Sequence, residues 1–258
     1  MKTILPLLLL SSFFLPATFS KAAESTQYYE IRSYVLGESG DPEALHNYLR
    51  NAWLPAMKRQ EIGPIGVFTN SDQDPSGSDR VVVMIPYDSA DAIQASKNKL
   101  VADSEYQNAS KSYLERGPKD SPYQRIESEM LVAMDCMPRL KVPANNLKNG
   151  DRVFEFRIYE SANERLGDLK VHMFNNGEVP IFLDCGIQPI FIGQAVIGPF
   201  TPNLSYLTSY PNEAARNDAW VAFRSHEDWQ VLKQVAKYQG TVSKIHKYVL
   251  VPANYSQI

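Results

Sequence analysis

The sequence predicts an α+β fold in which two tandem ferredoxin-like βαββαβ modules form one internal pseudo-dimeric α+β barrel. Three observations lead to this prediction. The string Glu-x-Arg-x-Tyr occurs in both residues 29–36 and residues 154–161. The spacing between the two strings recurs at later landmarks, and both halves show the same order of strand-like and helix-like segments. Duplicated modules keep their spacing wherever loops have not changed, so the chain is predicted to be a repeat.

The repeat is supported by six pairs of matching positions. The pairs are Glu30 and Glu155, Arg32 and Arg157, Tyr34 and Tyr159, Pro55 and Pro180, Tyr87 and Tyr210, and Tyr106 and Trp229. The first four pairs are 125 residues apart and the last two are 123 apart. One deletion of two residues, after the proline, accounts for the change of offset.

The first module is predicted to occupy residues 26–136. Its expected elements are a strand at 28–36, a helix from about 42 to 60, a hairpin at 62–87, a helical region at 89–115 and a strand at 127–134. Asp41 and Pro42 are typical of a helix N-cap and first turn. The β-branched run at 80–87 follows a turn-rich segment, as in a hairpin. The predicted order is therefore β-α-β-β-α-β.

The second module, residues 151–255, repeats this order after a proline- and asparagine-containing linker at 137–150. Its expected elements are a strand from 152, a helix at 163–183, strands at 187–194 and 204–210, a helix at 213–238 and a strand at 246–251. Trp220 and Phe223 lie three apart on one helix face and, with Trp229, are expected in the core. Such a module leaves one sheet face bare, so the two sheets are predicted to cover one another.

The N-terminal segment indicates export. Residues 1–22 contain Lys2, an apolar run and small residues that suit cleavage after Ser20 or Ala22, as in a secretory signal peptide. The run of about 12 residues is shorter than the roughly 20 that span a bilayer, so no membrane association is expected after cleavage. Loss of Lys2 and Lys21 leaves 24 of 26 basic residues against 29 acidic ones, a net charge of −5. Without a basic block, nucleic acid is not an expected partner. We expect a periplasmic or secreted protein.

The two cysteines leave an alternative open. Cys136 and Cys185 would meet an oxidising compartment after export and could form a disulfide. Two buried free thiols are equally consistent with the sequence. Asn108, Asn203 and Asn254 begin glycosylation sequons, which matter only in a eukaryotic source.

The second module resembles a known family. The segment SYLTSYPNEAARNDAWVAFRSHEDWQVLK, residues 205–233, is similar to the NIPSNAP signature: an aromatic-ended strand, then Arg, Ala-Trp, Phe and an acidic-Trp pair. The string at 154–161 resembles the family's first strand. The first module matches more loosely, with Lys97 in place of Trp220 and Tyr106 in place of Trp229. The resemblance implies the dimeric α+β barrel superfamily, which includes cofactor-free monooxygenases and haem enzymes, but it implies no established reaction for NIPSNAP itself.

The repeated strands suggest a candidate site. In the strand at 154–159, Phe154, Phe156 and Ile158 alternate with polar residues and are expected to pack under the helices. The opposite faces of the two repeated strands are then expected to line the space between the sheets. They carry the six candidate ligand-binding residues Glu155, Arg157, Tyr159, Glu30, Arg32 and Tyr34.

Two interpretations of these six residues stay open. Buried charges must be paired, and Glu beside Arg can form a purely structural ion-pair lattice. Alternatively, Arg32 or Arg157 grips the carboxylate of a small organic or anionic ligand.

The sequence suggests no metal and no cofactor. The four histidines, His46, His172, His226 and His246, do not recur at the repeat offset, and none belongs to a metal-binding motif. The acidic segment at 72–77 imitates half of a calcium loop, but Val83 stands where the bidentate Glu belongs, so a hairpin turn is expected. Nucleophile elbows and phosphate-binding glycine loops are also absent from the sequence.

The sequence therefore favours an exported, non-catalytic module that binds a small molecule between its sheets or a protein partner on its surface. The pairing of modules is internal, and the sequence leaves open whether the protein also forms an oligomer. The alternative is a cofactor-independent, monooxygenase-like enzyme that acts on a small organic substrate through Tyr159, Arg157 and Glu155 or their first-module counterparts. A deep cavity open to solvent, with an unpaired Arg or Glu, would favour the enzyme or a ligand site, and a barrel filled by side chains would favour a structural or partner-binding role.

Overall fold

The computed structural model describes residues 25–143 and 149–258. The predicted signal peptide lies outside these residues. The strands are β1 (Tyr28–Val35), β2 (Gly66–Asn70), β3 (Arg80–Tyr87), β4 (Arg125–Ala133), β5 (Val153–Glu160), β6 (Gln188–Ile197), β7 (Asn203–Tyr210) and β8 (Lys244–Pro252). The helices are α1 (Pro42–Tyr48), α2 (Leu54–Arg59), α3 (Asp91–Ala102), α4 (Ser104–Leu114), α5 (Glu164–Met173), α6 (Val179–Asp184), α7 (Glu213–Ser225) and α8 (Glu227–Leu232).

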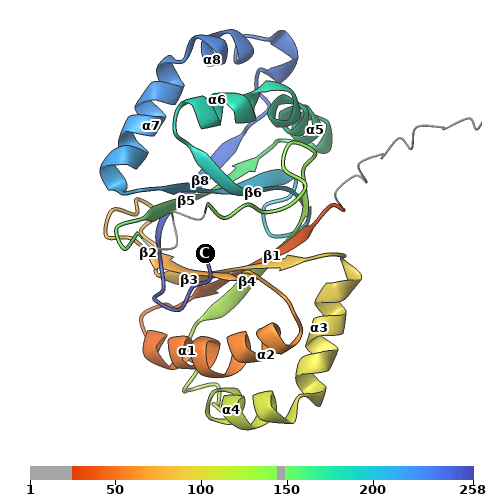
Figure 1. Cartoon of the computed structure of the whole chain (residues 1–258), viewed down its shortest axis with the longest axis vertical. Helices are drawn as coiled ribbons and strands as arrows, with labels where there is room; N and C mark the ends of the chain where they lie inside the picture. Colours follow the sequence, from red (N-terminus) through yellow and green to blue (C-terminus); the bar gives the residue numbers. More distant parts are fainter. Residues whose placement is uncertain (1–24, 144–148) are drawn as a thin grey trace, which may run out of the picture.

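The strands form a closed antiparallel barrel in the order β1-β3-β2-β8-β5-β7-β6-β4. Two contacts join the halves: β2 pairs with β8, and β4 pairs with β6. Helices α1–α4 lie on one side of the strands and α5–α8 on the other (Figure 1). The predicted α+β barrel, built from two tandem repeats that close one β layer, is confirmed. The two closing contacts are short: β4 meets β6 at residues 130–133, and β2 meets β8 at residues 68–70.

Four helices begin at side-chain caps of the same kind. The side chains of Asp41, Asp103, Asn163 and Asn212 accept hydrogen bonds of 2.9–3.0 Å from the backbone N–H three residues later. Each cap satisfies one of the unpaired donors at the start of α1, α4, α5 or α7.

The long helices that the sequence predicts are interrupted. The helix expected at 163–183 is divided into α5 and α6 by a π-helical turn, Phe174–Glu178, in which Asn176 and Gly177 leave helical geometry. The helix expected at 213–238 breaks at His226, whose backbone is extended and whose ring accepts a hydrogen bond from the Asp228 N–H. The residues that end these segments are weak helix formers, and their local hydrogen bonds replace the helical ones.

The strand faces are opposite to the prediction. Phe154, Phe156 and Ile158 do not pack under the helices; they lie inside the barrel with Tyr29 and Ile31 of the other half. The polar faces point outward under the helices. Tyr34 packs in the core beneath α1 and α2, and Tyr159 packs in the core with Phe174 of the α5–α6 turn. Alternation separates the two faces of a strand, but here both faces are buried, so it cannot show which one meets the helices.

The chain's last residues close part of the barrel. Ile258 is fully buried in the interior core with Phe68. The Ile65 N–H donates to the Gln257 side chain at 2.7 Å, and the Val67 N–H donates to the Ser256 hydroxyl at 3.0 Å. The end of the chain consequently lies between the two halves (Figure 1), and it fills the interior beside the start of β2.

Two further expectations can be compared with the structure. Cys136 and Cys185 are free thiols, so the disulfide alternative is not the one present. Trp220 and Phe223 are buried in the core under α7, as predicted, and Trp229 packs against that core but is only partly buried. Within residues 25–143 and 149–258, we find no helix with the length and apolar character needed to cross a bilayer.

Candidate functional site

The predicted polar row of the second module is an ion-pair network under α7. Glu155 is fully buried, and its Oε2 accepts hydrogen bonds from Arg216 Nη1 at 2.5 Å and Trp220 Nε1 at 2.9 Å. Arg157 Nη1 lies 3.3 Å from the other oxygen, Oε1. The Arg157 guanidinium also stacks 4.2 Å from the Trp220 ring. Tyr159 accepts a 2.7 Å hydrogen bond from Tyr206. The side chains of α7 and the strands therefore supply most of the partners of this row, although Glu155 Oε1 and Arg157 Nε have no hydrogen bond among the described residues.

The first module has a simpler version of this network. Arg32 donates to Glu30 Oε1 through Nε and Nη2, at 3.1 and 2.8 Å, and to the Tyr34 hydroxyl at 3.4 Å. The Arg32 guanidinium lies 5.4 Å from the Trp53 ring. Tyr87 donates to the second Glu30 oxygen at 3.4 Å. The structure thus keeps the six predicted residues in two separate clusters, one under each helical layer, and does not bring them together between the sheets.

Substitution of Arg157 tests the structural interpretation. The Arg157→Met variant should lose about 1–3 kcal/mol of unfolding free energy, because Glu155 keeps Arg216 and Trp220 but loses one charged partner. Urea denaturation measures the loss. Binding of small amines, alcohols and carboxylates, measured by ligand-observed NMR, should match the wild type; loss of binding at unchanged stability would contradict this interpretation.

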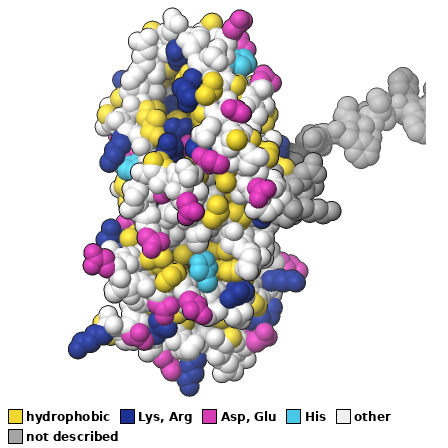
Figure 2. All heavy atoms as spheres, turned by 90° about the vertical axis from the view of Figure 1, so that its left-hand side faces the viewer, with side chains coloured by type: hydrophobic (Ala, Val, Ile, Leu, Met, Phe, Trp, Pro, Cys, Tyr) yellow, Lys and Arg dark blue, Asp and Glu magenta, His cyan; other side chains and the backbone are white. Residues whose placement is uncertain are grey.

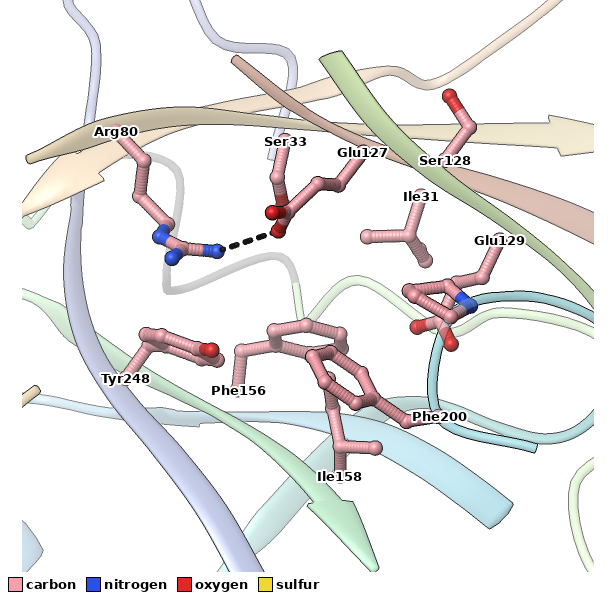
Figure 3. A pocket seen from close by; sticks show the side chains of 11 residues that line it. Ile31, Ser33, Arg80, Glu127, Ser128, Glu129, Phe156, Ile158, Phe200 and Tyr248 are labelled. Atoms are coloured by element: carbon pink, nitrogen blue, oxygen red, sulfur yellow. Dashed lines mark ion pairs between the residues drawn. The ribbon is translucent and has the colours of Figure 1, made fainter. Parts of the chain in front are cut away.

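A different polar cluster lies inside the barrel. It surrounds a cavity of about 20 Å³ that β1, β3, β4, β5, β8 and the β6–β7 loop enclose. Arg80, Ser33 and Glu127 lie along one side, and Tyr248, Phe156, Ile158 and Phe200 lie opposite (Figure 3). The volume holds about one water-sized group, since such a group needs roughly 10–15 Å³. Apolar side chains of the interior core pack around this cavity.

Glu129 is the unusual residue of this cavity. It is only 6% exposed. Neither of its carboxyl oxygens has a hydrogen-bond partner of normal geometry among the described residues. Burial raises its pKa from 4.5 to about 7, and the nearby polar groups of Ser205 and Asn203 oppose this shift only in part. The Ser205 hydroxyl donates to Asn203 Oδ1 at 3.1 Å, and Asn203 Nδ2 lacks a partner.

The backbone of the β6–β7 loop lies directly on Glu129. A Cβ atom at Gly198 would come within 2.7 Å of the Glu129 Cβ, so only glycine allows this approach. Pro199 and Phe200 follow in the same loop, and the Phe200 ring lies 4.3 Å from the His246 ring. The loop therefore covers the Glu129 end of the cavity with aromatic and apolar surface.

Arg80 and Tyr248 form the other wall of the cavity. Arg80 Nη1 lies 3.7 Å from Glu127 Oε2, and its guanidinium lies 4.5 Å from the Tyr248 ring. The same two side chains line a groove of about 370 Å³ on the surface, together with residues of the β2–β3 loop and of β8, including His246. Arg80 and Tyr248 thus separate the cavity from a larger, solvent-open groove.

The histidines have local partners. His172 and His46 hydrogen-bond the hydroxyls of Tyr238 and Tyr255, at 2.7 and 2.5 Å, and His246 pairs with Glu160. Among the residues described, no three His, Cys, Asp or Glu side chains gather as a metal site would require. The segment 71–79 forms the predicted turn between β2 and β3, where Asp74 accepts a 2.8 Å hydrogen bond from the Val249 N–H.

Sequence reasoning missed Glu129, although the sequence contains a signal. In β4, residues 127, 129, 131 and 133 share one face and read Glu, Glu, Leu, Ala. Two acidic residues therefore continue a face that becomes apolar, which is unusual for a strand that buries that face. Arg80, Tyr248 and Phe200 carry no comparable signal, because only the barrel closure brings their elements together.

The outer surface carries charge of both signs. On the face that Figure 2 shows, acidic and basic side chains are interspersed among polar and apolar ones. This mixture matches the small net charge of the chain, −3.

Comparison with solved structures finds proteins of the same fold. Two solved structures, from Lactobacillus acidophilus and Fusobacterium nucleatum, are of proteins proposed to be monooxygenases. The first has a TM-score of 0.53 and 10% identity, covering 88% of this chain and 94% of its own. The second has a TM-score of 0.56 and 9% identity, covering 89% and 94%. At this identity they share the fold alone.

The family of this chain is shown by its sequence. An uncharacterised NIPSNAP-like domain protein from Burkholderia xenovorans is 18% identical and covers 42% of this chain and 90% of its own, with a TM-score of 0.38. No curated protein matches the chain significantly. The sequence profile of the NIPSNAP family matches residues 29–136 and again residues 154–257. The chain therefore belongs to the NIPSNAP family and contains two copies of its domain in tandem.

Proposed function

We propose that this protein is an exported, non-catalytic binding protein. It binds a small organic molecule in the cavity beside Glu129, which we call the polar end of the barrel. The single observation that carries the proposal is Glu129, a buried carboxyl whose two oxygens have no normal hydrogen bond within residues 25–143 and 149–258. A buried polar group without a partner costs free energy and contributes nothing to stability. A ligand that supplies the missing partner explains why such a group is present.

The size and character of the surroundings support this function. The cavity has apolar and aromatic walls with a few polar groups, as small-molecule sites usually do. By itself it accepts only one small group. The adjoining groove of about 370 Å³ has room for the remainder of a ligand, within the roughly 300–1,000 Å³ typical of such sites. The polar end of the ligand would lie at Glu129, and its body would reach the groove once Arg80 and Tyr248, which stack at 4.5 Å in the free protein, moved apart.

A fragment screen with matched variants tests the proposal. Ser33 lines the cavity, so Ser33→Leu should fill it and weaken binding of any fragment by about tenfold or more. Ser112→Leu, in a separate hollow between α1 and α4, should leave binding unchanged. Ligand-observed NMR on the three proteins measures the effect, and thermal unfolding verifies that each is folded.

Glu129→Leu serves as a second variant in case Ser33→Leu does not fold. Fragments that bind the wild type and both cavity variants equally would contradict the proposed site. A wild type that binds none of the fragments would also contradict it, and would favour a protein partner on the outer surface.

One observation favours a cofactor-independent, monooxygenase-like enzyme as a second candidate. A carboxyl whose pKa is about 7 is suited to take a proton from a substrate at neutral pH. An oxygen electrode with electron-rich phenols as substrates tests this candidate. Uptake that disappears in Glu129→Gln would support it, and uptake no faster than in buffer would rule out this reaction.

Export is part of this proposal. Residues 1–22 have the pattern of a signal peptide, and N-terminal sequencing of the exported protein should give Lys21 or Ala23 as the first residue.

We also propose a common origin for the two halves. The strand order of the first half, β4-β1-β3-β2, corresponds to that of the second half, β8-β5-β7-β6. This order supports descent of each half from one ferredoxin-like βαββαβ module.

A further inference from the structure

We infer that the ligand at the polar end of the barrel is a small primary amine, whose ammonium group binds the carboxylate of Glu129. This inference rests on the proposed small-molecule site and specifies the class of molecule that the site accepts. Three features support it: the charges that face the cavity, the hydrogen-bonding groups left unused, and the space beside them.

The charges facing this end of the barrel leave Glu129 without a counterion. The ionisable groups there are Arg80 on β3, Glu127 and Glu129 on β4, Glu160 on β5, and His246 and Tyr248 on β8. Arg80 pairs with Glu127, and His246 pairs with Glu160. No basic side chain among the described residues forms an ion pair with Glu129. A buried, ionised carboxylate requires a counterion, and a cationic ligand would provide it.

The unused hydrogen-bonding groups are mainly acceptors. An ionised carboxylate offers about four acceptor positions, and a primary ammonium offers three donors. Asn203 Nδ2 is the one unused donor beside Glu129 among the described side chains. Even if it turned toward the carboxylate, most acceptor positions would remain open. A ligand carboxylate, by contrast, would meet a second carboxylate there, at an electrostatic cost.

The available space selects a small head group. The cavity of about 20 Å³ accepts a group the size of water. A primary ammonium is of this size, but a trimethylammonium group is several times larger. The close contact between Gly198 and Glu129 limits expansion on the loop side. Phe156 and Phe200 present ring surfaces toward the cavity, which attract cations (Figure 3).

The inference predicts a particular pH dependence. The ionised form of Glu129 binds the ammonium, and its pKa in the free protein is about 7. Between pH 6 and pH 8 the ionised fraction rises about tenfold, so amine affinity should rise by about the same factor. A neutral ligand that accepted a hydrogen bond from the protonated carboxyl would show the opposite trend.

Calorimetry with four matched probes tests the inference. The probes are 2-phenylethylamine, its N,N,N-trimethylammonium analogue, 2-phenylethanol and 3-phenylpropanoate. At pH 8 the primary amine should bind about tenfold or more tightly than each of the others. Glu129→Gln should remove this preference and the pH dependence. Glu115→Gln, on the exposed surface after α4, should retain both.

The outcomes separate this inference from the proposed function. Equal or tighter binding of the alcohol, the carboxylate or the trimethylammonium probe would overturn the amine inference and leave the small-molecule site in place. The same holds if the fragment screen yields binders but none of the four probes binds. Absence of binding in both the screen and the calorimetry would overturn both.

Discussion

Replacement of Glu155 by alanine should lower the free energy of unfolding by about 3–5 kcal/mol. Glu155 is fully buried, accepts hydrogen bonds from Arg216 and Trp220, and forms an ion pair with Arg157. Its loss would leave two largely buried guanidinium groups with fewer counterions and an indole N–H without an acceptor. Urea denaturation of the wild type and the variant measures the difference, provided that both show one cooperative transition.

Glu213 provides the matched control. It pairs with the same Arg216, at 2.5 Å, but its side chain is 30% exposed. Glu213→Ala should therefore cost only about 1 kcal/mol, because solvent partly screens this pair and Arg216 keeps its hydrogen bond to Glu155. If Glu155→Ala cost no more than Glu213→Ala, the network under α7 would not stabilise the fold as described.

Removal of the Glu129 carboxylate should make the protein more stable at neutral pH. The unfolded-state pKa is about 4.5 and the folded-state pKa is about 7. Below pH 4.5 the carboxyl is protonated in both states and carries no penalty. As pH rises from 4.5 to 7, the unfolded chain releases its proton first, and stability falls. Between pH 5 and pH 8, the stability of Glu129→Gln relative to wild type should rise by about 2–3 kcal/mol.

Denaturation curves at both pH values test this expectation. Glu115→Gln controls for the loss of one negative charge, because its side chain is 66% exposed, and its stability relative to wild type should not change with pH. A Glu129→Gln variant with the same relative stability at pH 5 and pH 8 would show that Glu129 has a partner in the folded protein. A stabilising substitution at a ligand-binding residue is the expected sign of a site retained for function.

The architecture of this protein could be predicted from its sequence because the relevant signals are local and repeated. The Glu-x-Arg-x-Tyr string and the cap at Asp41 reflect short-range structure, and the offset of 125 residues reflects the repeat. Covering the bare sheet face then required a partner, and the second module provides it. The helix breaks at Asn176 and His226 were missed because they depend on local hydrogen bonds within otherwise helical segments.

The orientation of β1 and β5 could not be predicted from alternation. Phe156 and Arg157 lie on opposite faces, as expected, but each face is buried by a different layer. What decides the orientation is the position of Arg216 and Trp220 on α7, 61 and 65 residues after Glu155. Those helix residues offer a cation and an N–H to Glu155, whereas the inner face of the closed barrel offers mainly apolar side chains. The candidate site was missed for the same reason, since its walls meet only when the barrel closes.

The most direct test of the account is an NMR titration of the Glu129 carboxyl carbon, with and without 2-phenylethylamine. We expect a pKa of about 7 in the free protein and a pKa lowered by about one unit or more when the amine is bound at saturation. A pKa below about 5 in the free protein, or one that the amine leaves unchanged, would contradict the conclusion that Glu129 is an unpartnered carboxyl available to a ligand.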